Sequence, residues 1–296
     1  MNIAEILSGM GQGIVFVIIC ILFIWLAKQI DDWRTSDFDD DIQIDDGNAA
    51  VGLRRAGLYL AIAIALSGAL SGAGRGFVSD LFILLLDGVI ILACMFSCRW
   101  INDKVMLGHI SNDEECIREF IDKKGITTKG NTAVGMVEAG IFIATGFILR
   151  GSLSGEGGTF IQGIESTFFF FVAGQICLLA FGYLYEIITP FNVREEIKDN
   201  NLAAGVGLGG ILIALGIVLQ ASIAGPFTGW ENDIVNFAFY AFAGVILLLA
   251  FRVIIEKLLL PTTNLATEVK EDRNVAALIV AQCAINAVAI IIAFSL

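Results

Sequence analysis

The sequence predicts an all-α, polytopic membrane helix bundle with eight transmembrane helices. Of its 296 residues, 57% are apolar and the mean hydropathy is +0.81, whereas soluble domains are only about half apolar. The apolar residues gather in runs of roughly 20, the length that crosses the hydrocarbon core of a bilayer. A short motif, Asn-x-Ala, opens four of these runs and predicts that the helices form a tandem repeat.

The expected transmembrane spans follow one another along the whole chain. They cover residues 12–28, 49–72, 77–98, 132–150, 166–188, 201–224, 234–256 and 274–295. The first span is expected to stay in the mature protein, because only Glu5 among the residues before it is charged and no small-residue cleavage site follows it.

Basic residues predict how the spans are oriented. If the connections after spans 1, 3, 5 and 7 share one side, 16 of the 18 Lys and Arg residues lie there, and only Arg75 and Arg150 lie opposite. Cytoplasmic loops carry the excess of Lys and Arg, and acidic residues contribute little to this rule. The sequence therefore predicts that both termini lie outside the cytoplasm, despite a net charge of −12.

An asparagine opens each even-numbered span at the predicted cytoplasmic side. The four are Asn48, Asn131, Asn201 and Asn274, spaced 70 to 83 residues apart, as tandem helix hairpins would be. The first turn of a helix has free N–H groups, and an asparagine side chain accepts hydrogen bonds from them. Helix capping is the favoured interpretation, with ligand binding as the alternative.

The chain also divides into two similar halves, residues 1–159 and 160–296. A shift of 153 residues aligns Asn48 with Asn201 without a gap, and the first half has ten extra residues after Arg99. Each half contains four spans, an even number, so both halves insert in the same direction as parallel repeats. The four tandem hairpins thus form two parallel pseudo-symmetric halves.

Residue size predicts which helices lie inside. Small residues recur at four-residue spacing in the even-numbered spans, as at Gly57, Ala61 and Ala65, and such stripes let helices approach closely in lipid. The odd-numbered spans are bulkier, as at Phe168 to Phe171. We therefore expect the even-numbered helices inside the bundle and the odd-numbered ones toward lipid.

The stretch ITPFNVREEIKDNNLAAGVGLGGILIALGIVL, Ile188 to Leu219, resembles the loop and second helix of the YjfL-like bacterial inner-membrane family of unknown function (DUF 350). Family members commonly have four spans, so the resemblance implies two fused copies, with residues 160–296 the closer match. The first copy has an Asp-rich loop where the second copy has the Thr189-Pro190 loop of the family pattern. The resemblance implies the bacterial inner membrane, envelope-stress systems and neighbours similar to spermidine synthases or glutathionylspermidine synthetases, and it supplies no catalytic residues.

One acidic residue, Asp87, lies near the middle of the span 77–98. An ionisable group at that depth is costly and marks a functional site by default. Two interpretations stay open: a cation or proton site between helices, or a hydrogen-bonded carboxyl that joins two helices. In either case we expect Asp87 to face the bundle rather than lipid.

Arg54 and Arg55 lie two turns inside the second span. Arg55 and Glu138 each follow the asparagine of their own span by seven residues, so they occupy equivalent places at one depth. We expect these two to form an ion pair near the membrane surface. The alternative, favoured for Arg54, is that the side chain extends to the interface and keeps its charge in water.

The first predicted cytoplasmic loop, residues 29–47, is strongly acidic. It is not an EF-hand, because Ile42 stands where such a loop needs glycine. A solvated loop is the favoured interpretation, and the alternative is a docking surface for a cationic partner, Mg²⁺ or a polyamine. The candidates for this surface are Asp37, Asp39, Asp40, Asp41, Asp45 and Asp46.

The second predicted cytoplasmic loop is expected to contain an amphipathic helix at residues 112–124. Asn112 would cap this helix and Gly125 would end it. Its apolar face would consist of Cys116, Ile117, Phe120 and Ile121. We expect it to lie against the membrane surface or a neighbouring loop.

The sequence shows no nucleophile–base pair, metal cluster or phosphate-binding loop. We therefore expect no enzyme, no cofactor, no metal and no nucleic-acid partner. Two classes remain: a membrane scaffold or partner protein in envelope maintenance or stress response, and a small-cation or polyamine channel or transporter that uses Asp87. The first is favoured, because no proline interrupts the middle of a span. Its partners would be the lipid bilayer and a cytoplasmic or membrane protein, and a homo-oligomer stays open.

Overall fold

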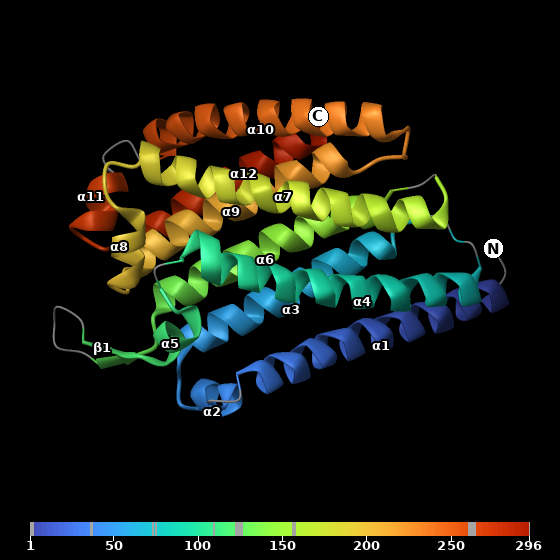
Figure 1. The fold of residues 1–296 in the computed structure, drawn as a ribbon, viewed down its shortest axis with the longest axis horizontal. Coiled ribbons are helices and arrows are strands. Elements are labelled where there is room, and N and C mark those ends of the chain that lie inside the picture. The colour runs from blue at the N-terminus through green and yellow to red at the C-terminus, as the bar shows by residue number, and fades with distance from the viewer. Residues whose placement is uncertain are drawn as a thin grey trace.

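The computed structural model describes residues 3–35, 38–72, 74, 76–108, 110–121, 127–155, 158–259 and 265–295. Within these residues, eight helices are long and apolar enough to cross a membrane, which confirms the predicted spans (Figure 1). They are α1 (Ile3–Arg34), α3 (Ala49–Ala69), α4 (Phe77–Ile101), α6 (Thr132–Leu153), α7 (Phe160–Ile188), α9 (Leu202–Ile223), α10 (Trp230–Leu259) and α12 (Val275–Ser295).

Short elements lie between the long helices. A six-residue helix precedes each even-numbered span: α2 (Asp40–Asp45), α5 (Asn112–Ile117), α8 (Val193–Lys198) and α11 (Leu265–Lys270). A π-helical turn, η1 (Asn102–Met106), continues α4, and strands β1 (Glu119–Ile121) and β2 (Thr127–Lys129) form an antiparallel hairpin after α5. The short helices all lie at the left of Figure 1, which we call the loop-helix end.

The predicted loop helix at residues 112–124 is wrong in its second part. The helix ends at Ile117, and the chain then forms strand β1, in which Phe120 pairs with Thr128 of β2. Aromatic and β-branched residues favour strands, and here the nearby threonines supply the partner strand. Residues 122–126, which include the expected end of that helix, lie outside the described part of the chain.

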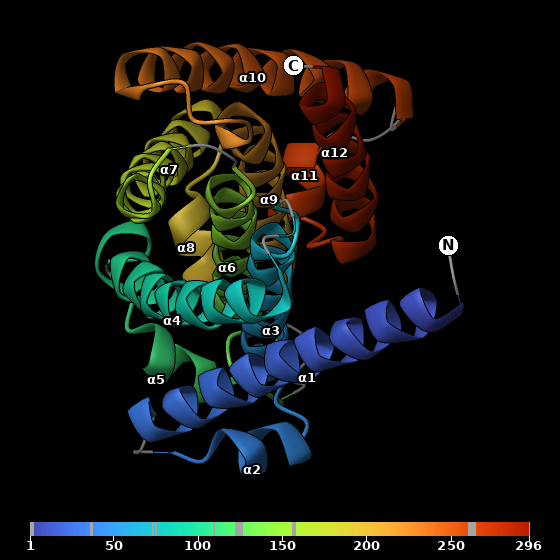
Figure 2. The same ribbon diagram turned by 90° about the vertical axis from the view of Figure 1, so that its right-hand side faces the viewer.

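The helices of the even-numbered spans are α3, α6, α9 and α12. They form one row through the interior, and Figure 2 shows this row end-on. In the most apolar stretch of each helix, 56% of α3, 78% of α6 and 89% of α9 are buried, against 11–44% in the odd-numbered spans, which confirms that the helices of the odd-numbered spans lie outside. Only 33% of α12 is buried, because it stands at one end of the row. α4 covers the seam between α3 and α6, α7 that between α6 and α9, and α10 that between α9 and α12.

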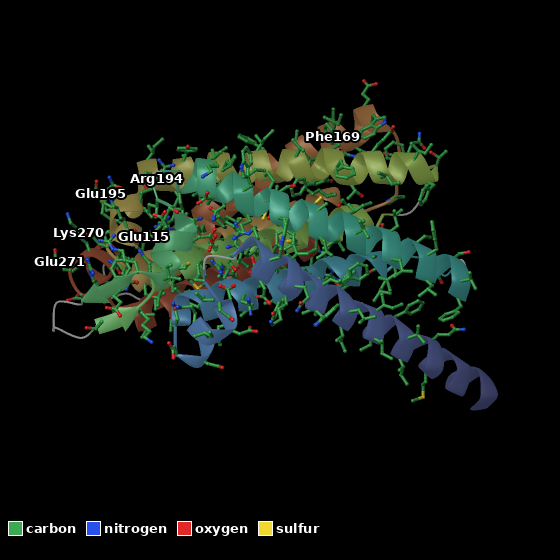
Figure 3. The ribbon with its side chains drawn as sticks, turned by 60° about the horizontal axis from the view of Figure 1, so that its bottom comes forward. Glu115, Phe169, Arg194, Glu195, Lys270 and Glu271 are labelled. Atoms are coloured by element: carbon green, nitrogen blue, oxygen red, sulfur yellow. The ribbon has the colours of Figure 1, made fainter. Side chains whose placement is uncertain are left out.

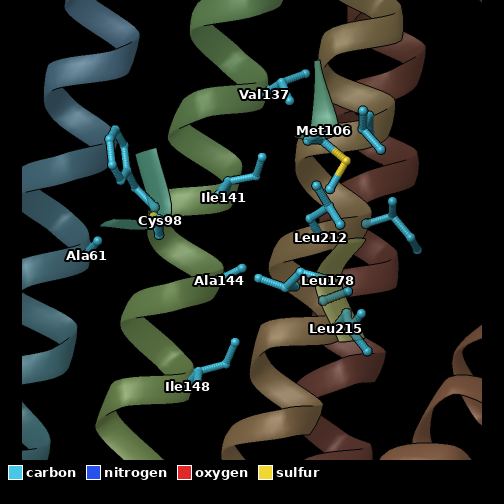
Figure 4. Close-up of a cluster of buried hydrophobic side chains, with 14 of the residues drawn as sticks. Ala61, Cys98, Met106, Val137, Ile141, Ala144, Ile148, Leu178, Leu212 and Leu215 are labelled. Carbon is cyan, nitrogen blue, oxygen red and sulfur yellow. The ribbon is translucent and has the colours of Figure 1, made fainter. Parts of the chain in front are cut away.

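Glycine lets the helices of the row touch backbone to backbone. A Cβ atom added at Gly57 would lie 2.4 Å from Cα of Ala139, and one added at Gly140 would lie 2.5 Å from Cα of Gly209. Buried side chains such as Ile141 fill the remaining space (Figure 4), and Ile148 of α6 lies against Gly174 of α7. The row is therefore a close-packed layer of the kind that small residues permit in lipid.

The two halves correspond element by element. The shift of 153 residues takes α2 onto α8, the start of α3 onto the start of α9, and α5 onto α11. Because the equivalent helices run in the same direction along the same row, the halves are parallel repeats, as predicted. The ten extra residues of the first half are taken up by the β1–β2 hairpin.

The four opening asparagines cap their helices. The side-chain oxygen of each accepts a hydrogen bond from a backbone N–H of the first turn. The donors to Asn48, Asn131, Asn201 and Asn274 are Ala50, Val134, Ala203 and Ala277 respectively.

Three of these asparagines also tether the next repeat. The side-chain amide of Asn48 donates to the carbonyl of Cys116 at 2.8 Å, that of Asn131 to Ile197 at 2.8 Å and that of Asn201 to Val269 at 2.7 Å. Each acceptor is the fifth residue of the following short helix. One side chain thus fixes both the start of an inner helix and the position of the neighbouring loop.

Candidate functional site

Charged side chains gather at the loop-helix end, as Figure 3 shows. Among the described residues of the first half, ten of them form one connected cluster, which we call the arginine–aspartate network. Its members are Lys28, Arg34, Arg54, Arg55, Arg99, Asp31, Asp32, Asp40, Asp41 and Asp113. Five basic groups face five carboxylates, so their formal charges balance.

Arg54 is the buried centre of the network, with no exposed side-chain surface. Its Nη2 atom lies 2.9 Å from both carboxylate oxygens of Asp40, and its Nη1 atom lies 3.0 Å from Asp113. Arg54 thereby ties α2 and α5 to α3. The expectation that Arg54 keeps its charge in water is wrong, because the loop carboxylates fold back over the guanidinium and take the place of water.

Arg55 binds a second group of carboxylates. It pairs with Asp40 at 2.9 Å and also with Asp32 and Asp41. Asp41 in turn lies 2.7 Å from the Lys28 ammonium. The hydrogen bond from Lys28, with a further one from Arg55, holds the pKa of Asp41 below its usual range.

Asp113, at the start of α5, receives three arginines. Both its oxygens accept hydrogen bonds from Arg34 at 3.1 Å, and Arg54 and Arg99 bind it as well. Burial alone would raise the pKa of Asp113, but Arg99, Arg34 and Arg54 outweigh it and lower this pKa to about 2. Arg99 also pairs with buried Asp31 and so joins α4 to the end of α1.

Acid is expected to weaken the network through Asp113. Because its pKa falls from 3.8 to about 2 on folding, its contribution to stability is complete above about pH 4 and is lost as the pH falls through about 2. The melting temperature of Asp113→Asn should therefore drop less between about pH 5 and about pH 2 than that of the unchanged protein. Exposed Asp45→Asn is the control; equal drops for all three proteins would exclude this role of Asp113.

The structure does not form the expected Arg55–Glu138 pair. Glu138 is buried and accepts hydrogen bonds from the Asn112 amide at 3.3 Å and from the Cys116 thiol at 3.9 Å. Arg55 and Glu138 hold equivalent places on parallel helices of one row, so their side chains point in the same direction rather than toward each other. Asn112 is not the cap that was expected, because it is the first residue of α5 and its side chain binds Glu138. Burial raises the pKa of the Cys116 thiol.

The acidic loop is largely used within the chain. Asp39 accepts hydrogen bonds from the first N–H groups of α2. Asp40 and Asp41 belong to the network, where the chain's own Arg and Lys supply the cationic partner. Asp46 pairs with Lys129 at 3.0 Å. Of the other docking candidates, Asp45 is exposed and Asp37 lies outside the described residues.

Asp87 lies on α4, outside the network. It is partly buried, and it interacts with a neighbouring group. The next residue, Gly88, lies under the ring of Phe23 from α1. That Asp87 faces the bundle stays a prediction.

The second half holds mostly apolar residues where the first half has the network. At the shift of 153, the counterparts of Asp40, Arg54, Arg55 and Asp113 are Val193, Gly207, Leu208 and Ala266. The counterpart of Arg99 is Arg252, which lies 5.1 Å from the ring centre of Tyr185 beside a cavity of about 230 Å³. The network is therefore a feature of the first half.

The arginine–aspartate network acts as an electrostatic clamp, which holds α2, α5 and the end of α1 against α3 and α4. Within the described residues, no group of three or more His, Cys, Asp or Glu side chains is placed to hold a metal ion. The network carboxylates bind Arg and Lys instead, and Arg–carboxylate hydrogen bonds of this kind are strong and directional. Sequence reasoning missed the network, although five basic and five acidic residues at the same predicted membrane face were a signal for it.

The fold and the clamp define a polytopic integral membrane protein built from tandem, asparagine-capped helix hairpins. The chain belongs to the family described as Domain of Unknown Function (DUF350), whose profile matches residues 5–153 and again residues 159–296. The family copy thus occurs twice, as the resemblance implied.

Relatives of this chain are described as transmembrane proteins. A UPF0719 transmembrane protein of Aquifex aeolicus (strain VF5) is 25% identical over 233 residues, 78% of this chain and 80% of the relative. One of Mycolicibacterium paratuberculosis (strain ATCC BAA-968 / K-10) is 32% identical over 30% of this chain and 59% of its own length. The UPF0719 transmembrane protein YshE of Bacillus subtilis (strain 168) is 26% identical over 36% of this chain and 74% of its own length. No solved structure matches the chain.

Proposed function

We propose that this chain is a structural protein of the bacterial inner membrane, a scaffold or partner protein in envelope maintenance or stress response. The observation that carries the proposal is the close packing of the inner row. Helices α3, α6 and α9 touch through glycine and alanine backbones, and buried apolar side chains lie between the helices (Figure 4). A platform needs such rigidity, whereas a conduit needs a polar path between its helices.

Helix continuity supports the same proposal. Transporters commonly bind their substrates where helices are broken near the middle of the membrane. Here α6 and α9 run without a break over 22 residues each. A small-cation or polyamine channel that uses Asp87 is the alternative function, since this carboxyl lies within a span and interacts with a neighbour.

We assign the loop-helix end to the cytoplasm, with both termini in the periplasm. The distribution of Lys and Arg along the sequence supports this orientation. The arginine–aspartate network would then brace the cytoplasmic face. The exposed carboxylates of Asp39, Asp45 and Asp46 remain at that face for contact with a partner protein.

Flux measurements separate the two functions. We expect purified protein in lipid vesicles to pass no more K⁺, Mg²⁺ or spermidine than protein-free vesicles do, both unchanged and as Asp87→Asn. A scaffold also predicts that Asp87→Asn restores growth under envelope stress to a deletion strain as well as the unchanged gene does. Robust flux that Asp87→Asn abolishes, together with failed rescue, would overturn the scaffold and establish the conduit.

A further inference from the structure

The contacts within the inner row follow one rule. Positions are counted from the opening asparagine. Positions 2, 9, 13 and 20 of one helix touch positions 4, 8, 15 and 19 of the next helix, respectively. We call the first set the leading face and the second set the receiving face. In the α3–α6 contact the leading residues are Ala50, Gly57, Ala61 and Gly68, and the receiving residues are Gly135, Ala139, Gly146 and Arg150.

The α6–α9 contact repeats this rule at every position. Its leading residues are Ala133, Gly140, Ala144 and Gly151, and its receiving residues are Gly205, Gly209, Gly216 and Gln220. In the α9–α12 contact, Gly210 at position 9 touches Gln282 at position 8. Such a contact joins two different faces, so it can be repeated without limit unless the row closes on itself.

Within the described residues, the receiving face of α3 is uncovered. It consists of Gly52, Ala56, Ala63 and Ser67, and the last three are exposed. The space around Gly52 is open to 4 Å, whereas Gly135 at the same position of α6 lies against the backbone of Ala50. The face has the small residues that the other contacts use but no helix against it.

The leading face of α12 is uncovered as well. Its residues are Ala276, Cys283, Ala287 and Phe294, and all four are exposed. Three of them are small and stand where the preceding helices have Ala, Gly and Ala. The two ends of the row are therefore complementary by the same rule that joins its interior helices.

Helix α1 gives a separate indication. Each of the other outer helices covers a seam between two inner helices, whereas the inner helix that α1 packs against in the described part of the chain is α3. It is also the least buried span. An inner helix placed beside α3 would complete the seam over which α1 lies.

The polar tether gives a third indication. In the first three repeats the asparagine amide reaches the carbonyl of the fifth residue of the next short helix. Asn274 is exposed, and the partner described for its amide is Glu268 of its own repeat. The equivalent carbonyl at the other end of the chain belongs to Ile44 of α2, which is itself an exposed residue.

We propose that the chain assembles head to tail with further copies of itself, with α12 of one copy seated against α3 and α1 of the next. The inner row then continues across the contact, and Asn274 donates to the Ile44 carbonyl of the neighbouring copy. Because the row bends in Figure 2, repetition of the contact favours a closed ring. This assembly forms whether the chain acts as a scaffold or as a conduit.

A native cysteine makes the contact testable. Cys283 is at position 9 of α12, so it faces position 8 of the neighbouring α3, which is Ala56. In a background with Cys20→Ala and Cys177→Ala, oxidation of Ala56→Cys in native membranes should give disulfide-linked dimers and larger products. Ile176→Cys, on an exposed position of α7 away from both ends of the row, and Ala56→Cys with Cys283→Ser are the matched controls and should stay monomeric.

The mass of the complex in lipid nanodiscs gives an independent result. We expect an oligomer for the unchanged protein and for Ile176→Trp, and a monomer for Ala63→Trp, with equal melting temperatures of the protomers. Cross-linking at Ile176→Cys as efficient as at Ala56→Cys, or an unchanged protein that is monomeric in nanodiscs, would overturn the proposal. Products that contain a different protein in place of a second copy would overturn it as well.

Discussion

Arg54→Ala is expected to lower the free energy of unfolding by about 3–5 kcal/mol, the usual cost of removing one partner of a buried ion pair. Arg54 has no exposed side-chain surface and holds both Asp40 and Asp113. Its removal leaves the fully buried carboxylate of Asp40 with less positive charge in a place that water does not reach. Equilibrium unfolding in mixed micelles of a mild detergent and dodecyl sulfate measures this loss.

Arg34→Ala is the matched control. Arg34 binds the same Asp113, but 34% of its side chain is exposed, and exposed ion pairs contribute only about 0–1 kcal/mol. Equal small losses for both variants would show that the arginine–aspartate network does not hold the loop helices in place.

Gly140→Leu is expected to cost about 3 kcal/mol or more, at the upper end of the range for overpacked cores. A Cβ atom at this position lies 2.5 Å from Cα of Gly209, which is backbone and cannot turn aside. Helices α6 and α9 must therefore separate, and the seam under α7 opens. The same unfolding measurement reports the loss.

Gly163→Leu on α7 is the control, because nothing lies within 4 Å of its added Cβ atom. There the gain in helix propensity, up to about 1 kcal/mol, is the expected main effect. If Gly140→Leu were as stable as Gly163→Leu, the inner helices could not be in backbone contact.

Local patterns made much of the fold predictable. The apolar runs define the eight spans by length alone. The asparagine before each inner helix predicts the helix cap, because capping depends on only a few neighbouring residues. The small residues on α3 and the phenylalanines on α7 showed which helices lie inside.

The charge network depended on tertiary structure and was not predicted. The equivalence of Arg55 and Glu138 was correct, but parallel helices in one row present equivalent side chains in the same direction. The partners of Arg54 come from α2 and α5, whose positions are set by tethers such as that from Asn48 to Cys116. Over residues 119–121 the pattern of a helix and that of a strand compete, and only the pairing with Thr127–Lys129 decides for the strand.

Water access along α9 tests the close-packed inner row most directly. Single cysteines from Ala203 to Leu219 are to be treated with a membrane-impermeant maleimide from each side of the membrane. Ser222→Cys, beside the cavity of about 290 Å³ at the other end of the bundle, is the accessible control. A rigid platform predicts that none of the cysteines from 203 to 219 reacts above the level of the unchanged protein. Reaction at every third or fourth position along α9 would show a water-filled path and contradict the account.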